Sequence, residues 1–155
     1  MKKKILILIL FCNSIFAQNP VTITEKTKNF TKKEGLFNFY IDEQNARIYL
    51  EIKDLKKEFL YVNSLPAGLG SNDIGLDRGQ LGNERIVFFE KVGKKILLTQ
   101  PNYKYRAISN DPNEKRAVKD SFAASILWGF PLEAEENGSY LVEITDFLLR
   151  DSHEI

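Results

Sequence analysis

Paired runs of alternating apolar and polar residues, separated by short turns, constrain the fold of this chain most. Residues 36–42 (LFNFYID) and 47–52 (RIYLEI) have a period of two on both sides of a polar turn. Residues 85–92 (RIVFFEKV) and 95–100 (KILLTQ) flank Gly93-Lys94, and a glycine at the first turn position suits a tight two-residue hairpin of type II′. Because a period of two is that of a half-buried β-strand, the first pair of runs predicts an antiparallel hairpin, and the glycine turn predicts a second one.

Further strands are expected in the middle of the chain and near its C-terminus. Residues 58–65 (EFLYVNSL) indicate a more buried strand, since apolar residues dominate the run. Asn137-Gly138 is a strong hairpin signal, because both residues tolerate a positive φ, and Tyr140, Val142 and Ile144 alternate with the residues between them.

One helix is well marked. Asp111 is a suitable cap, Pro112 fits the first helical position, and Val118, Phe122 and Ile126 recur every four residues on one face. The sequence therefore predicts an α+β fold, mostly antiparallel β hairpins with one amphipathic helix at about 112–128.

The N-terminus has the layout of a secretory signal peptide. Three lysines precede an unbroken apolar run, and the segment Met1–Ala17 ends on a small residue. We expect cleavage after Ala17 and export to the periplasm, the outer surface or the medium. The apolar run is too short to span a bilayer, and the large Phe11 before Cys12 argues against a lipid anchor. The sequence thus predicts no transmembrane segment.

Removal of this peptide changes which functions the chain can perform. It removes the only cysteine, so the mature chain has no thiolate nucleophile or thiolate ligand. The loss of three lysines changes the formal net charge from +1 to −2. A chain without excess positive charge lacks the basic surface that nucleic-acid-binding proteins use. We expect residues 18–34, polar and rich in lysine, to form a flexible lead-in that buries little, followed by a β-rich domain at 35–155.

No catalytic constellation is evident in the sequence. The only histidine, His153, is the third residue from the end of the chain, where a triad or a zinc site could not hold an imidazole in place. The sequence therefore predicts no catalytic residue, no cofactor site and no zinc ligand within this chain.

A glycine-rich stretch, Leu65–Glu84, is the most unusual segment. It lacks the phosphate-binding templates and precedes a strand, so no helix N-terminus could receive an anion. Asn72, Asp73, Asp77 and Arg78 leave two interpretations open, a weak calcium site or a docking loop. Its interspersed leucines favour an ordered Ω-type loop that packs against the sheet or against a second domain.

Four strings of this sequence resemble the N-terminal region of large secreted bacterial zinc-dependent metalloproteases of the Bacteroidetes type. They are FNFYIDEQNARIYLEI, EFLYVNSLPAGLGSNDIGLDRGQLG, RIVFFEKVGKKILLTQPNYKYRA and AVKDSFAASILWGFPLEAEENGSYLVEITDFLLRD. The resemblance covers Gly35 to about His153. In that family a His-Glu-x-x-His zinc helix of the metzincin kind lies far downstream, so no zinc ligand can be assigned to a residue of this chain.

The resemblance implies a non-catalytic N-terminal domain or fragment, inactive alone, whose partner is the zinc-containing catalytic domain of the full-length protease. The apolar cluster at 147–149 fits either a short terminal helix docked on the sheet or a surface within a longer protein. The alternative is a free-standing periplasmic or surface binding module with a glycine-rich loop that binds calcium.

Overall fold

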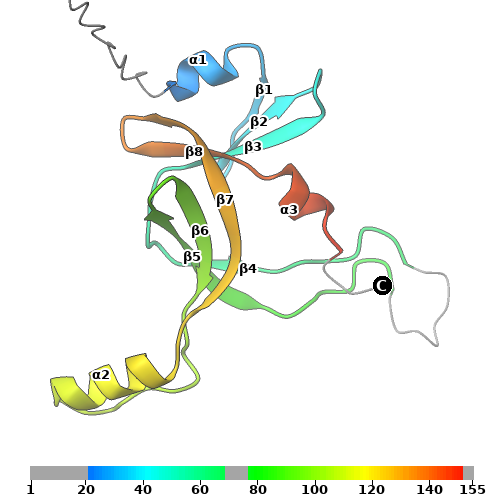
Figure 1. The fold of residues 1–155 in the computed structure, drawn as a ribbon. Helices are drawn as coiled ribbons and strands as arrows, with labels where there is room; N and C mark the ends of the chain where they lie inside the picture. Colours follow the sequence, from blue (N-terminus) through cyan, green and yellow to red (C-terminus); the bar gives the residue numbers. More distant parts are fainter. Residues whose placement is uncertain (1–20, 69–76, 152–155) are drawn as a thin grey trace, which may run out of the picture.

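The computed structural model describes residues 21–68 and 77–151, and their strands form one antiparallel sheet of eight strands in the order β1-β2-β3-β8-β7-β6-β5-β4 (Figure 1). The predicted α+β class, built mostly from antiparallel hairpins, is confirmed. In chain order the elements are α1 (Ile23–Thr27), β1 (Thr31–Lys33), β2 (Asn38–Asp42), β3 (Arg47–Ile52), β4 (Phe59–Tyr61), β5 (Arg85–Val92), β6 (Lys95–Gln100), α2 (Pro112–Ser121), β7 (Ser125–Glu136), β8 (Ser139–Glu143) and α3 (Thr145–Leu149).

Strand β7 joins the two halves of the sheet. Its first half pairs with β6 from Ser125 to Pro131, and its second half pairs with β8 from Leu132 to Glu136. The register skips Leu127 opposite β6 and Glu133 opposite β8. Such bulges bend a strand and increase its twist, and β7 is visibly curved in Figure 1. The sheet therefore curls around its main core instead of lying flat.

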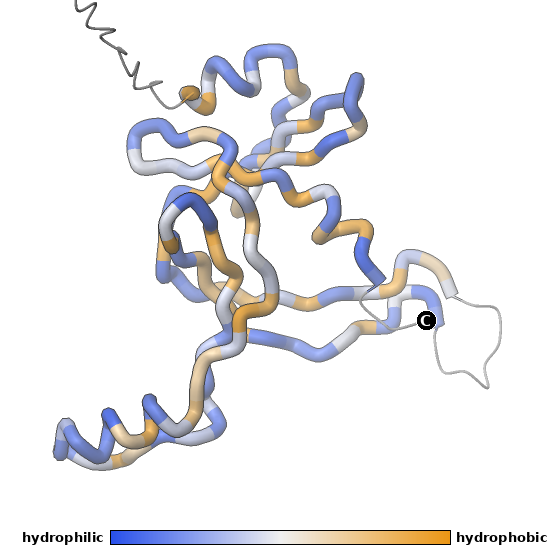
Figure 2. The backbone as a smooth tube through the Cα atoms, in the orientation of Figure 1, coloured by the Kyte–Doolittle hydropathy of each residue, from blue (hydrophilic) through white to orange (hydrophobic). Residues whose placement is uncertain are grey.

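The two ends of the curled sheet meet through aromatic side chains. Phe37, just before β2, lies 5.1 Å from Phe59 of β4 and 5.7 Å from Phe89 of β5, measured between ring centroids. The main core under this contact contains Ile52, Val87, Ile96, Leu98, Phe130 and Val142, all at most 2% exposed. Figure 2 shows the hydrophobic residues concentrated along these central strands.

Helix α3, near the end of the described chain, packs on this core through Phe147. The ring of Phe147 lies 5.3 Å from that of Phe130 and 5.7 Å from that of Trp128. Arg150 stacks over Phe147 at 3.6 Å and donates a hydrogen bond to the Tyr61 hydroxyl. In the predicted 147–149 cluster, Phe147 docks on the sheet, as expected for a short terminal helix. Leu148 and Leu149 are exposed to solvent.

The predicted hairpin turns are present. Gly93 has φ +58 between β5 and β6, as the first position of a II′ turn requires. Asn137 and Gly138 have φ values of 49 and 79 between β7 and β8, so both adopt the positive φ that the sequence predicted. The hairpin of β2 and β3 pairs Asp42 with Arg47 at its turn.

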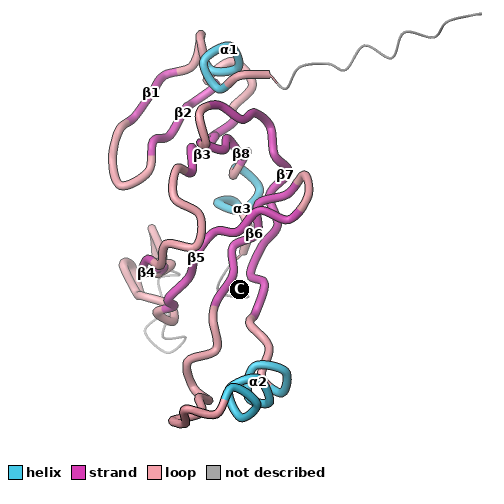
Figure 3. The backbone as a smooth tube through the Cα atoms, turned by 90° about the vertical axis from the view of Figure 1, so that its left-hand side faces the viewer, coloured by secondary structure: helices cyan, strands magenta, loops and turns pink. Residues whose placement is uncertain are grey.

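The predicted helix boundary was wrong. Helix α2 ends at Ser121 instead of about 128, and Ile126 belongs to β7, where it pairs with Thr99. The ladder between β6 and β7 satisfies the backbone from Ser125 onward, so the helical spacing of apolar residues is overridden by strand pairing. Helix α2 buries no residue, and the segment 101–124, here called the arm, projects away from the sheet (Figures 1 and 3).

The strand predicted at 58–65 is also shorter than expected. Only Phe59–Tyr61 forms β4, an edge strand whose residues are half-buried or exposed. Its single neighbour is β5, and this explains why it is less buried than its apolar composition suggested.

The expectation that residues 18–34 bury little was wrong for the residues that the structure describes. From Val21 onward this segment forms α1 and β1, and Ile23 is only 4% exposed. Together with Tyr40, Tyr49, Ala134 and Leu141, Ile23 forms a second core on the opposite face of the sheet. Thr22 and Glu25 form a capping box, which is a sequence signal for the start of a helix. The polar composition of the segment favoured a flexible lead-in instead.

Replacing Ile23 by alanine is expected to lower the free energy of unfolding by about 2 kcal/mol, because the buried side chain leaves a cavity under α1. The matched control is Val21→Ala, since Val21 is exposed and its loss should cost less than about 0.5 kcal/mol. Urea unfolding curves measure both values. Equal effects of the two substitutions would show that α1 does not cover a core.

Candidate functional site

The structure describes two of the four residues proposed for a calcium or docking loop. Asn72 and Asp73 lie outside the described residues, whereas Asp77 and Arg78 are exposed. The backbone amide of Asp77 donates to the Gln80 side chain at 3.0 Å. Within residues 21–68 and 77–151, no group of three or more histidine, cysteine, aspartate or glutamate side chains could hold a metal ion.

The two ends of the glycine-rich stretch are held together, as an Ω-type loop requires. The Leu65 amide donates to the Gln80 carbonyl at 3.0 Å, and the Gly79 amide donates to the Leu65 carbonyl at 2.8 Å. Ser64 and Leu81 form an isolated β-bridge next to these bonds. Leu65 is buried at the base of the loop, whereas Leu81 is exposed.

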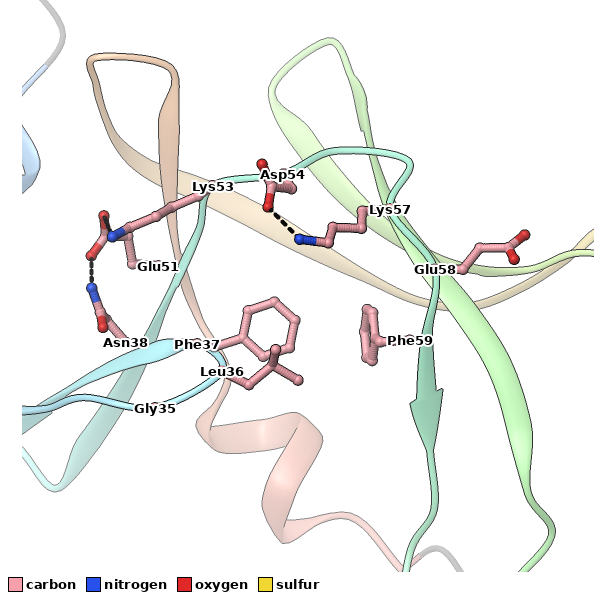
Figure 4. Close-up of a pocket in the computed structure, with 10 residues that line it drawn as sticks. All are labelled: Gly35, Leu36, Phe37, Asn38, Glu51, Lys53, Asp54, Lys57, Glu58 and Phe59. Atoms are coloured by element: carbon pink, nitrogen blue, oxygen red, sulfur yellow. Dashed lines mark hydrogen bonds and ion pairs between the residues drawn. The ribbon is translucent and has the colours of Figure 1, made fainter.

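A pocket of 130 Å³, here called the seam pocket, lies where the two ends of the curled sheet meet (Figure 4). Leu36, Phe37 and Phe59 form its apolar part, and the Phe37 and Phe59 side chains project toward each other from opposite sides. Its volume is roughly ten times the space that one water molecule needs. Since Leu36 is 82% exposed, the pocket is open to an incoming apolar side chain.

The charged residues around the seam pocket do not converge on it. Lys57 Nζ lies 3.1 Å from Asp54 Oδ2, and both side chains are well exposed, so this ion pair contributes little to stability. Glu58 points away from the two rings in Figure 4 and instead accepts a hydrogen bond from the Tyr103 hydroxyl at the base of the arm. The seam pocket is therefore an apolar site with a polar rim and lacks the convergent groups of an acid–base centre.

The arm carries the largest group of exposed apolar side chains among the described residues. Ile108 is 91% exposed, and Tyr103, Tyr105 and Phe122 are all more than one-third exposed. Tyr105 and Phe122 stack at 4.2 Å and hold the two sides of the arm together. A group of apolar side chains left open to solvent in this way is typical of a surface that contacts another protein.

A hollow of 360 Å³ lies between the base of the arm and the start of β5. Ile86 of β5 and Tyr103 of the arm both line it, and the neighbouring Leu60, which pairs directly with Ile86, is also exposed. These side chains extend the apolar surface from the arm onto the sheet. We refer to Leu60, Ile86, Tyr103 and Ile108 together as the outer surface.

The arm, residues 101–124, has five cationic side chains and three carboxylates, a formal excess of two positive charges. Arg116 forms an ion pair with Asp120 at 3.6 Å. The described structure places no carboxylate within 4.0 Å of the charged nitrogen atoms of Lys104, Arg106, Lys115 and Lys119. Such free cations attract an acidic partner surface and lose that attraction as salt is added.

Two hydrogen-bonded groups with shifted pKa values, Glu51 and Tyr40, line the groove beside α1. Burial opposes ionisation of Glu51, but hydrogen bonds from Asn38 (2.8 Å) and the Tyr40 hydroxyl (2.9 Å) outweigh it and lower the pKa of this carboxyl. Burial, together with the same Glu51 carboxylate, raises the pKa of Tyr40 to about 12. Both groups are satisfied by contacts within the protein, which indicates a structural role.

Sequence reasoning placed the candidate site on the glycine-rich stretch and missed the seam pocket and the arm. The seam pocket joins residues far apart in the chain, and no local pattern predicts it. The arm had a readable signal, since NYKYRA alternates aromatic and basic residues, but the same alternation is typical of a strand. Residues 103–105 are irregular in the structure, and Tyr103 and Tyr105 are both exposed.

None of the helices described in the structure is long and apolar enough to cross a membrane. No curated protein and no solved structure matches the chain. Residues 20–68 match a family model described as a domain of unknown function (DUF5118), and residues 79–155 match a second one, also described as a domain of unknown function (DUF5117). Strands of the first segment pair with strands of the second, β3 with β8 and β4 with β5, so the two matched segments share one sheet.

Proposed function

We propose that this chain is the non-catalytic N-terminal domain of a secreted zinc-dependent metallopeptidase and that it packs on a catalytic domain encoded outside this chain. The proposal rests on the resemblance of residues 35–153 to that class of protease. The zinc ligands and the general base belong to the catalytic domain, so this chain alone is inactive toward peptides.

The exposed arm is the structural observation that supports the packing part of this proposal. Helix α2 has ten residues and buries none of them, so packing within this chain stabilises it little. The segment that leads into it has several exposed apolar side chains. Contact with a second domain would bury the outer surface, and the free cations of the arm would select an acidic face on that domain.

A second candidate function, a free-standing binding module, is favoured by the seam pocket. Its apolar part and exposed Leu36 suit the insertion of one apolar side chain from a ligand. The calcium version of this function depends on the oxygen ligand Asp77 together with Asn72 and Asp73, which lie outside the described residues. A calcium titration of the melting temperature separates this function from the first.

Replacing Ile108 by aspartate is expected to weaken binding to the catalytic domain by at least about tenfold, or 1.4 kcal/mol. The reason is that Ile108, 91% exposed in the isolated chain, would be buried in the contact. The measurement is a titration of the purified chain against the His-Glu-x-x-His catalytic domain from the same genome, by calorimetry at two salt concentrations.

Leu149→Asp is the matched control, because Leu149 is 79% exposed and lies on α3, outside the outer surface. It should leave the affinity within about twofold of the unsubstituted chain. Absence of any binding by the unsubstituted chain would refute the proposed function. Binding that both substitutions weaken equally would refute the role of the arm alone.

A further inference from the structure

A polar groove of 430 Å³ lies beside α1 and the second core, away from the arm, and it shares Asn38, Glu51 and Lys53 with the rim of the seam pocket. Three lysines line it from three different elements. Lys28 follows α1, Lys32 lies on β1, and Lys53 follows β3. The lysine-rich segment that was expected to be a flexible lead-in thus contributes to one wall of a groove.

The charges of these lysines are only weakly neutralised by the protein. Lys32 pairs with the exposed Glu34 at 2.7 Å, and Lys53 lies 3.9 Å from Glu51. Among the residues described, no carboxylate lies within 4.0 Å of the Lys28 ammonium group. Exposed pairs of this kind contribute little and separate readily when a stronger anion arrives.

The two carboxylates that line the groove are engaged by neutral donors of the protein. Glu136 accepts hydrogen bonds from the backbone amide and the hydroxyl of Thr24, at 2.9 and 2.8 Å. Glu51 accepts hydrogen bonds from Asn38 and Tyr40 in the same way. These contacts hold the two carboxylates, which stay anionic, in the wall of the groove, so the three lysines leave the lining with a formal excess of one positive charge.

The remaining lining suits a ligand with many hydroxyl groups. Asn137 and Ser139 add an amide and a hydroxyl, which can both donate and accept hydrogen bonds. Phe30 also lines the groove, and its ring stacks on Tyr49 at 5.3 Å, which fixes an aromatic platform. Aromatic rings of this kind bury the apolar face of a ligand, and the volume lies within the range typical of small-ligand sites.

We propose that this groove binds an anionic saccharide, a sugar unit that carries a carboxylate or sulfate. Lys28, Lys32 and Lys53 hold the anionic group, Asn137 and Ser139 bind hydroxyls, and Phe30 packs against the ring of the sugar. This site does not depend on the packing function proposed above, because it lies away from the arm.

The test is a calorimetric titration of the full chain with digalacturonate, with lactose as the neutral disaccharide and inorganic phosphate as the free anion, in about 20 mM salt. We expect digalacturonate to bind at least about tenfold more tightly than lactose or phosphate. The triple variant Lys28→Gln, Lys32→Gln, Lys53→Gln should weaken this binding by at least about tenfold.

The control is a second triple variant, Lys94→Gln, Lys115→Gln, Lys119→Gln, which removes the same charge from exposed lysines outside the groove. It should change the affinity for digalacturonate by less than about twofold. Absence of binding up to about 10 mM digalacturonate overturns the proposal. Equal weakening by both triple variants, or phosphate binding as tight as that of the saccharide, overturns it as well.

Discussion

Replacing Phe130 by alanine is expected to lower the free energy of unfolding by about 4 kcal/mol, twice the loss expected for Ile23→Ala. Phe130 is 2% exposed and lies at the centre of the main core. Its ring contacts Phe147 of α3 at 5.3 Å and Phe89 of β5 at 6.3 Å, so its loss leaves a cavity between three elements. Because a domain of this size is stable by only about 5–15 kcal/mol, a large part of its stability would disappear.

Phe122→Ala is the matched control, since it removes the same side chain from the arm. Phe122 is 40% exposed, and its ring stacks on that of Tyr105. Its loss should cost no more than about 1.5 kcal/mol. Urea unfolding at pH 7 compares the two variants, and a Phe130→Ala variant within about 1 kcal/mol of the unsubstituted chain would contradict the described core.

Alkaline pH is expected to destabilise the domain through Tyr40. Burial, aided by the Glu51 carboxylate, raises the pKa of Tyr40 from 10.0 to about 12 in the folded chain. The folded state therefore holds the phenolic proton more tightly than the unfolded state does. This contribution is fully present below pH 10, falls by about 1.4 kcal/mol by pH 11 and is lost above pH 12.

Tyr40→Phe isolates this effect from the other groups that titrate at alkaline pH. At pH 7 the variant should be less stable by about 1–2 kcal/mol, because Glu51 loses a hydrogen-bond donor. The stability difference between the two proteins should then shrink between pH 9 and pH 11. A difference that stays constant over this range would show that Tyr40 titrates normally.

The local elements of the fold were predictable, whereas their long-range pairing was not. Alternating residues and turn signals at Gly93 and Asn137-Gly138 predicted three hairpins, because both signals act over a few residues. The pairing of β3 with β8 joins Leu50 to Val142, and no local pattern specifies such a contact. The end of α2 was misplaced for the same reason, since the ladder with β6 decides where β7 begins.

The burial of residues 21–34 was missed because composition was given more weight than capping. Ile23 occupies a short helix that covers the second core, and one buried isoleucine in a lysine-rich segment is a weak signal. Once α1 is placed, the same lysines lie around a groove lined by Asn38, Asn137 and Ser139. The groove is formed by residues from both family-matched segments, so only the folded sheet brings them together.

The proposed packing of this chain on a catalytic domain is tested most directly by hydrogen–deuterium exchange of the chain with and without that domain. We predict slower exchange in the arm, residues 101–124, and along β4 and β5, where the outer surface lies, with no change at the α1 face. Exchange that is unchanged in the arm when the two proteins are mixed at concentrations that saturate binding would contradict the proposal.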